Sequence, residues 1–290
     1  MFPVRLRRLF NNNDPPNNPG RDGDASTHQP ESVADAGIYY PSLWDVLKTR
    51  YLVQWKAFKH GLPAELLDAI IDAAEYWPST EHRMQGMRRI ISNDRDQVLL
   101  KSVPLCYDRK SLEQTEVPKP LPHRTLHPCR KIVFRLLSHD QGPGPIRENM
   151  YQSSWTWSDT EVIPAAHMKS MYADGIEQEI LYNERGQEKL HYGPNDPLLL
   201  PGDNKLKVNG CRVSQPQQSV ITWHYLDDIQ PESTEAYEIE RSQGRGRFTL
   251  DGRGVRELEI GDSIALWARA RFPGWRNHVD YASIRIFWAV

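Results

Sequence analysis

Tryptophan and arginine side chains recur near the C-terminus at the spacing of a β-strand. Trp267, Arg269 and Arg271 alternate with alanine, so in a strand they lie on one face. A turn that contains Trp275 and Arg276 comes directly after them. Guanidinium groups beside exposed indole rings can bind an anion or a carboxylate, or stack on a sugar ring. We therefore expect a carbohydrate or anionic ligand at this end of the strand.

A structural role for the same residues is the alternative. In that interpretation the arginines pair with acids such as Asp159 or Asp227, and Trp275 covers the end of the domain. Side-chain exposure distinguishes the two interpretations, because buried and paired arginines would argue against a ligand site.

A second polar cluster, His139 to Gly142, comes after a strand predicted at residues 131–137. Asp140 and Gln141 can hydrogen-bond a sugar or a peptide, which makes them further candidate ligand residues. In the alternative interpretation, Asp140 and Gly142 form a turn and His139 packs on a neighbouring ring.

Residue types that bind metals occur at two places, but their spacing is unlike that of a zinc site. The first place holds His123, His127 and Cys129, and the second holds His224 with two aspartates. A structural zinc site needs about four ligands, typically with closely paired cysteines. The sequence also has no glycine-rich phosphate loop and no Gly-x-Ser-x-Gly turn. We expect no metal, no cofactor and no catalytic residue.

The composition argues against several classes of partner. Of the 290 residues 39% are hydrophobic, the mean hydropathy is -0.66, and the formal net charge is -2. No apolar run approaches the roughly 20 residues that span a bilayer, and no excess of positive charge favours nucleic acid. The three cysteines are widely spaced and odd in number, which favours a reducing compartment, cytoplasmic or nuclear.

Residues 129–290 alternate between apolar and polar side chains in short segments separated by turns. The segments with this pattern are 131–137, 153–163, 206–213, 219–226, 255–260, 264–271 and 281–290. Strands without helices between them are typical of an antiparallel sheet protein. We predict a mainly β fold, an antiparallel β-sandwich that is jelly-roll-like, with a small α-helical N-terminal part.

Three other segments precede this domain. We expect residues 1–40 to be a disordered tail, because residues 11–37 hold hardly any large apolar side chain. Residues 41–92 are expected to form a helical module. Residues 93–128, interrupted by five prolines, are typical of a linker, with one short strand around 97–103.

The helical module is predicted to be a hairpin of two helices. Ser42 can cap the first helix, which ends at Gly61. The second helix spans residues 62–77, where a proline suits the first turn. Its apolar residues fall on one side: Leu66, Ile70, Ala74 and Trp77, with Leu67 and Ile71 beside them.

The second predicted helix opens with the motif Leu62-Pro63-x-Glu65-Leu66-Leu67-x-x-Ile70-Ile71. This motif resembles the opening of an F-box, the small helical module that joins proteins to a cullin ubiquitin ligase. In that family the Leu-Pro pair and the apolar face after it contact the linker subunit of the ligase. The resemblance implies that Leu62, Pro63, Leu66 and Ile70 bind this partner. Because the apolar pattern of the further F-box helices is missing after Pro78, the alternative is a hairpin that only packs on the sandwich.

Four further motifs lie in the C-terminal half. They are Ser-His-Asp-Gln-Gly at 138–142, Ser-Trp-Thr-Trp at 154–157, Trp-Ala-Arg-Ala-Arg-Phe-Pro-Gly-Trp at 267–275 and Ile-Phe-Trp-Ala-Val at 286–290. Together they resemble a family of uncharacterised fungal proteins. The resemblance implies a C-terminal β-sandwich and an F-box-like helix upstream of it.

These observations lead to one expected function and two alternatives. We expect a non-enzymatic interaction protein whose sandwich recognises a ligand or partner and whose helix tethers it to a ubiquitin ligase. The first alternative is a structural or self-associating sandwich without a small-molecule site, and the second, with the least support, is an enzyme. We expect no nucleic-acid and no membrane partner.

Overall fold

The computed structural model describes residues 38–91, 96–115, 117–142, 149–166 and 205–290. The chain divides into two units, Met1–Tyr39 and Tyr40–Val290. All described helices and strands belong to the second unit. The predicted disordered tail lies almost entirely outside the described residues. No helix among the described residues is long and apolar enough to cross a membrane.

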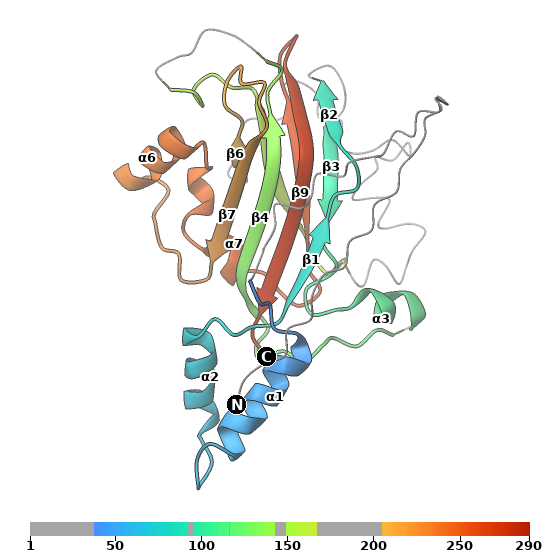
Figure 1. Cartoon of the computed structure of the whole chain (residues 1–290), viewed down its shortest axis with the longest axis vertical. Helices are drawn as coiled ribbons and strands as arrows, with labels where there is room; N and C mark the ends of the chain where they lie inside the picture. The colour runs from blue at the N-terminus through green and yellow to red at the C-terminus, as the bar shows by residue number, and fades with distance from the viewer. Residues whose placement is uncertain (1–37, 92–95, 116, 143–148, 167–204) are drawn as a thin grey trace, which may run out of the picture. The chain divides into compact units, whose positions relative to one another are not determined.

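Two antiparallel sheets form the body of the second unit (Figure 1). The first has the order β1-β9-β4-β7, with β2 also paired to β9. Its strands are β1 (Ser79–Arg83), β2 (Arg88–Ile91), β4 (Cys129–His139), β7 (Gln217–His224) and β9 (Arg276–Trp288). The second has the order β3-β8-β5-β6. Its strands are β3 (Gln97–Lys101), β5 (Thr156–Ile163), β6 (Lys205–Val208) and β8 (Ser263–Ala270).

One apolar core joins the inner faces of the two sheets. Ile132 and Phe134 of β4 and Ile284 of β9 belong to the same buried cluster as Ile264 and Leu266 of β8. Alternate residues of each strand point to this layer, as the period of a β-strand requires. The predicted mainly β class, with antiparallel sheets preceded by helices, is confirmed.

The helices lie at the ends and edges of the sheets. The first two are α1 (Leu43–Trp55) and α2 (Ala64–Ala73). Further along the chain are α3 (Arg109–Gln114), α6 (Thr234–Gln243), the 3-10 helix η2 (Arg247–Thr249) and α7 (Arg253–Arg256). Ser42 and Asp45 form a reciprocal capping box at the start of α1, so the predicted cap is confirmed.

The boundaries expected from the sequence need three corrections. The segment 41–92 is not wholly helical, since β1 and β2 belong to it and pair with β9 about 200 residues later in the chain. The segment 93–128 holds β3, where a short strand was predicted, and also α3. The predicted strand at 255–260 is wrong, because α7 (Arg253–Arg256) begins after Gly252, whose φ is +70°, and residues 257–260 form no strand.

The second helix is also shorter than predicted. It ends at Ala73, and Glu75 adopts a φ of +48°, which turns the chain toward Pro78 and β1. Trp77 therefore lies beyond the helix, where it is fully buried.

Candidate functional site

The hairpin of α1 and α2 lies at the end of the sheets where β1 begins (Figure 1). Gly61 makes the turn between the two helices possible. Its φ is +76°, and a Cβ atom there would lie 3.3 Å from the ring of Trp55. The two helices are further tied by the ion pair between Arg50 Nη2 and Asp68 Oδ1, at 2.7 Å.

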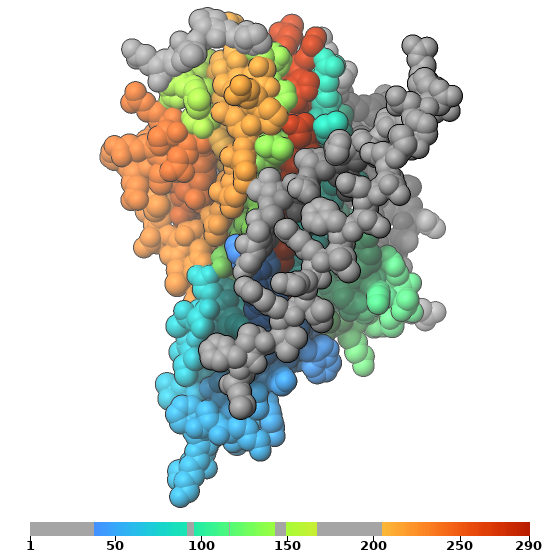
Figure 2. All heavy atoms as spheres, in the orientation of Figure 1, coloured from blue at the N-terminus to red at the C-terminus, as the bar shows by residue number. Residues whose placement is uncertain are grey.

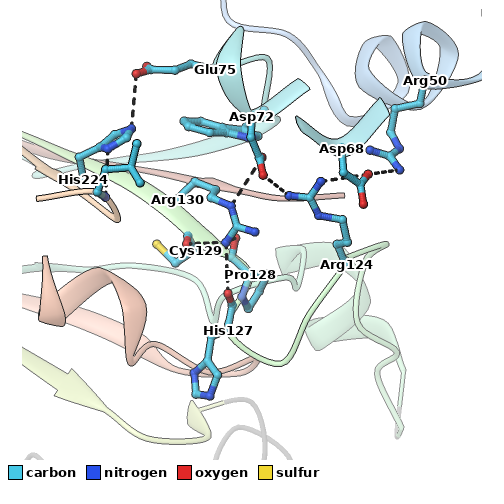
Figure 3. Close-up of polar contacts among 12 residues, drawn as sticks. Arg50, Asp68, Asp72, Glu75, Arg124, His127, Pro128, Cys129, Arg130 and His224 are labelled. Carbon is cyan, nitrogen blue, oxygen red and sulfur yellow. Dashed lines mark hydrogen bonds and ion pairs between the residues drawn. The ribbon is translucent and has the colours of Figure 1, made fainter. Parts of the chain in front are cut away.

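An ion-pair network fastens α2 to the sandwich (Figure 3). Asp68 and Asp72 both pair with Arg124, with Arg124 Nη1 at 2.9 Å from Asp68 Oδ1. Asp72 also lies 3.6 Å from Arg130 Nε and accepts a hydrogen bond from the indole of Trp77 at 2.8 Å. Burial would raise the pKa of Asp68, but the hydrogen bonds from Arg124 and Arg50 hold this pKa below its usual value.

The end of α2 is held in the same way. Glu75 pairs with Lys131 of β4, and its other oxygen lies 3.4 Å from Nε2 of His224 in β7. Asp68 and Asp72 are four residues apart and lie on one side of α2, and Glu75 follows just beyond the end of the helix. Leu67 and Ile71, next to them, are buried with Trp77 and Phe287. This side of α2 is therefore fixed to the sheet.

The opposite side of the hairpin exposes large apolar side chains. Leu66 is 54% exposed, whereas its neighbour Leu67 is 0% exposed. On α1, Trp44 is 78% exposed, and Trp55 and Tyr51 are also exposed. We call the exposed apolar residues of this hairpin the hairpin surface: Trp44, Tyr51, Leu52, Trp55, Phe58, Leu66 and Ile70. Figure 2 shows the hairpin at the surface of the second unit, at the end of the sheets where β1 begins.

Two of the four residues singled out by the F-box resemblance lie on this surface. Leu66 and Ile70 are exposed, Pro63 precedes them at an exposed position, and Leu62 is half-buried against the cluster of Leu67. The structure thus separates Leu66 and Ile70 from Leu67 and Ile71, which the sequence pattern had placed side by side.

The predicted ligand site around Arg269 and Arg271 needs correction. Arg269 is only 5% exposed, and its guanidinium group binds Asp159 at 2.5 Å and Asp96 at 2.9 Å. Arg271 binds the same Asp96 at 2.6 Å. Both arginines already neutralise buried carboxylates, so they are not exposed anion receptors. The structural interpretation, which named Asp159 as a partner, agrees with these contacts.

Asp140, the candidate ligand residue in the second polar cluster, is not exposed to a ligand either. It has no exposed surface, and its carboxylate accepts hydrogen bonds from the backbone N–H groups of Gln141 and Arg212. Burial raises its pKa, and these two hydrogen bonds act in the opposite direction. His139 stacks on His278, with ring centroids 4.6 Å apart. These contacts agree with the alternative interpretation, in which this segment forms a turn and His139 packs on a neighbouring ring.

Of the remaining candidate ligand residues, Gln141 and Arg276 are in contact with each other. The side-chain oxygen of Gln141 accepts a hydrogen bond from the backbone N–H of Arg276 at 3.1 Å. Arg276 is exposed and Trp275 is half-buried. The described contacts do not join these three residues to Arg269 or Arg271 in one site.

His82 is a residue that sequence reasoning missed. It lies in β1, and its Nε2 accepts a hydrogen bond from the backbone N–H of Val103 at 3.3 Å. Burial lowers the pKa of His82 to about 4, and the positive charge of Arg109 acts in the same direction, while Glu81 acts against it. A histidine within a run of charged residues gives no sequence signal, because only the pairing of β1 with β9 turns it inward.

We expect the stability of the protein to fall as the pH is lowered from 6.5 to about 4. The unfolded chain protonates His82 near pH 6.5, whereas the folded chain resists protonation down to a pKa of about 4. The stabilisation is therefore complete above pH 6.5 and is lost as the pH falls through this window, by about 2–3 kcal/mol for this residue. Urea unfolding at several pH values measures it. His82→Gln keeps an acceptor for Val103 and should flatten this part of the curve, whereas His60→Gln, at an exposed position, should not.

Neither a metal nor a known relative defines the site. Among the described residues, no group of three or more His, Cys, Asp or Glu side chains is placed to hold a metal ion. No family model, no curated protein and no solved structure matches the chain. The geometry of the hairpin and the sandwich is therefore the basis for assigning a function.

Proposed function

We propose that this chain is a non-enzymatic interaction protein that docks on a partner protein through the hairpin surface. The partner would be the linker subunit of a cullin ubiquitin ligase, as the F-box resemblance of α2 implies. The sandwich would then present a second protein to the ligase. The observation that carries the proposal is the exposure of Leu66 and Ile70 on a helix whose other side is fixed to the sheet.

The composition of the hairpin surface supports protein binding. Soluble proteins rarely expose several large apolar side chains on one small element unless a partner covers them. Tryptophan and tyrosine are enriched among the residues that contribute most to protein–protein affinity. Trp44, Tyr51 and Trp55 recur at intervals of seven and four residues along α1, so they follow one side of that helix.

The ion-pair network supports the same conclusion. Arg124 and Arg130 hold Asp68 and Asp72, so α2 cannot turn its exposed side toward the sheet without breaking several partly buried ion pairs. A surface that is already held in its binding orientation loses less conformational entropy when a partner binds.

The hairpin differs from an F-box in the elements that come after it. Beyond α2 the chain enters β1 instead of further helices. The contact with the ligase would therefore be made by α1 and α2 alone, and the sandwich would take the place of the missing helical support.

A pair of adjacent leucines tests the proposal. Leu66→Asp places a carboxylate on the hairpin surface and should leave the fold intact while it weakens partner binding by at least about 30-fold, the scale of a central interface residue. Leu67→Asp buries the same charge and should unfold the hairpin. Affinity purification of the tagged full chain with mass spectrometry measures the partners, and thermal unfolding reports the fold.

Three results are informative. Recovery of cullin-ligase subunits with the wild type and not with folded Leu66→Asp supports the proposal. Equal recovery with both, or no ligase subunit with either, contradicts it. If the wild type is a dimer by light scattering and Leu66→Asp is a monomer without ligase subunits, the hairpin surface mediates self-association instead.

A reducing compartment, the cytoplasm or the nucleus, fits this proposal. Cys106 and Cys129 are free thiols, and both are buried. Burial raises the pKa of Cys129 to about 12, so this thiol stays protonated and unreactive.

A further inference from the structure

A pocket opens between the two sheets at the edge formed by β1 and β3. Its volume is about 490 Å³. In the described strand order, β1 is the end strand of one sheet and β3 is the end strand of the other. The segment 103–109 lines a further side. The pocket therefore lies where the apolar layer between the sheets meets solvent.

His82 reaches this pocket from the inner face of β1. It pairs with Ile284 of β9, which belongs to the core between the sheets, and paired residues of antiparallel strands share a face. Because Nε2 accepts the hydrogen bond from Val103, the neutral ring carries its proton on Nδ1. Within the described part of the chain Nδ1–H makes no hydrogen bond, so it is available as a donor to a ligand.

The charged groups around the pocket favour an anion. Arg83, Lys101 and Arg109 line it together with two carboxylates, Glu81 and Asp108. Both carboxylates are already engaged. Glu81 accepts hydrogen bonds from Arg83 and from Arg285 of β9, and Asp108 accepts one from the backbone of α3.

Arg109 differs from Arg83 because its guanidinium group is not bound to a carboxylate of the pocket. It is exposed and makes no ion pair with any described residue. Arg109 and His82 line the same pocket, and the positive charge of Arg109 helps to lower the pKa of His82. An anion placed between them would gain from both groups.

We propose that this pocket binds a small organic anion, whose carboxylate or phosphate group lies between His82 and Arg109. Nδ1–H of His82 donates one hydrogen bond to the anion, and the guanidinium group of Arg109 donates others. The volume is in the range of small-molecule sites and leaves room for an organic body against Thr80 and Tyr107. This site is separate from the hairpin surface, so it does not depend on the proposed docking function.

Binding by the full chain can be followed by calorimetry and by NMR of the histidine ring protons. The probes are inorganic phosphate, glucose 6-phosphate and citrate, which separate phosphate from carboxylate recognition and test the need for an organic body. At least one organic probe should bind saturably. It should also raise the pKa of His82, because a bound anion favours the imidazolium form.

Three variants locate the site. Arg109→Gln should weaken binding about tenfold or more, because a charge-assisted hydrogen bond is lost. Lys110→Gln removes the same charge from the next residue, which does not line the pocket, and should leave binding unchanged. His82→Gln keeps the acceptor for Val103 and should remove the dependence of binding on pH near the pKa of His82.

The proposal is overturned if no probe binds saturably at about 10 mM, above the micromolar-to-millimolar Kd typical of specific small ligands. It is also overturned if Arg109→Gln and Lys110→Gln weaken binding equally, since the anion would then respond only to the general surface charge.

Discussion

Replacing Arg269 with methionine should destabilise the protein by about 3–5 kcal/mol, the scale of removing one partner from a buried ion pair. Methionine keeps much of the side-chain volume but leaves Asp159 without its cation. Burial already raises the pKa of Asp159, and the charge of Arg269 opposes this more than that of Lys205 does. The variant should therefore lose most stability at neutral pH, and less where Asp159 can take up a proton. Urea unfolding at two pH values measures both effects.

A double variant tests the cause of this loss. Arg269→Met with Asp159→Leu removes a whole ion pair, while Asp96 keeps its bond to Arg271. The double variant should be more stable than Arg269→Met alone, because an apolar replacement of a buried pair is often neutral. Arg276→Ala, at an exposed position of β9, serves as the control and should change stability by less than about 0.5 kcal/mol. A loss below about 1 kcal/mol in Arg269→Met would contradict the structural role.

Replacing Trp77 with alanine should destabilise the protein by about 3–5 kcal/mol, as expected for a large aromatic side chain in a core. Trp77 is fully buried between the hairpin and the sheet, with Tyr225 at 6.0 Å between ring centroids. Because it joins α2 to the strands, its loss should also loosen the hairpin. Hydrogen exchange should increase in α1 and α2 more than in β8.

Trp77→Phe is a milder change at the same site. It keeps one aromatic ring in the core, but it removes the second ring of the indole and the hydrogen bond to Asp72, whose carboxylate still pairs with Arg124. We expect a loss of about 1–2 kcal/mol from the hydrogen bond and the smaller ring together, below that of Trp77→Ala. If the two variants are equally stable, the contact between Trp77 and the sheet does not hold the hairpin in place.

The antiparallel sandwich could be predicted because the residue types in β4, β8 and β9 alternate with the period of two that is typical of a β-strand. The role of Arg269 could not be predicted in this way. Alternation shows that Trp267, Arg269 and Arg271 share a face, but the carboxylate of Asp96 lies 173 residues away in the sequence. No local pattern reveals such a partner.

The hairpin shows the same limit. The sequence places Leu66 and Ile70 on one side of α2 with Leu67 and Ile71 beside them, so the periodicity alone does not say which of these two pairs meets the core. That choice is made by Arg124 and Arg130, which lie far along the chain and bind Asp68 and Asp72. β1 was missed because all five of its residues are polar, and its pairing with β9 is a tertiary effect.

The order of the strands has a consequence for biosynthesis. β9 is an inner strand of the first sheet and β8 of the second, and both come after all the other described strands in the sequence. β1 pairs with β9 and β3 pairs with β8, and both partners are synthesised later. Neither sheet can therefore be completed while the ribosome is still making residues 1–262. Such long-range pairing makes folding slow and leaves apolar strands uncovered in the meantime. We therefore expect the nascent chain to be more prone to aggregation than the folded protein until β9 has been synthesised.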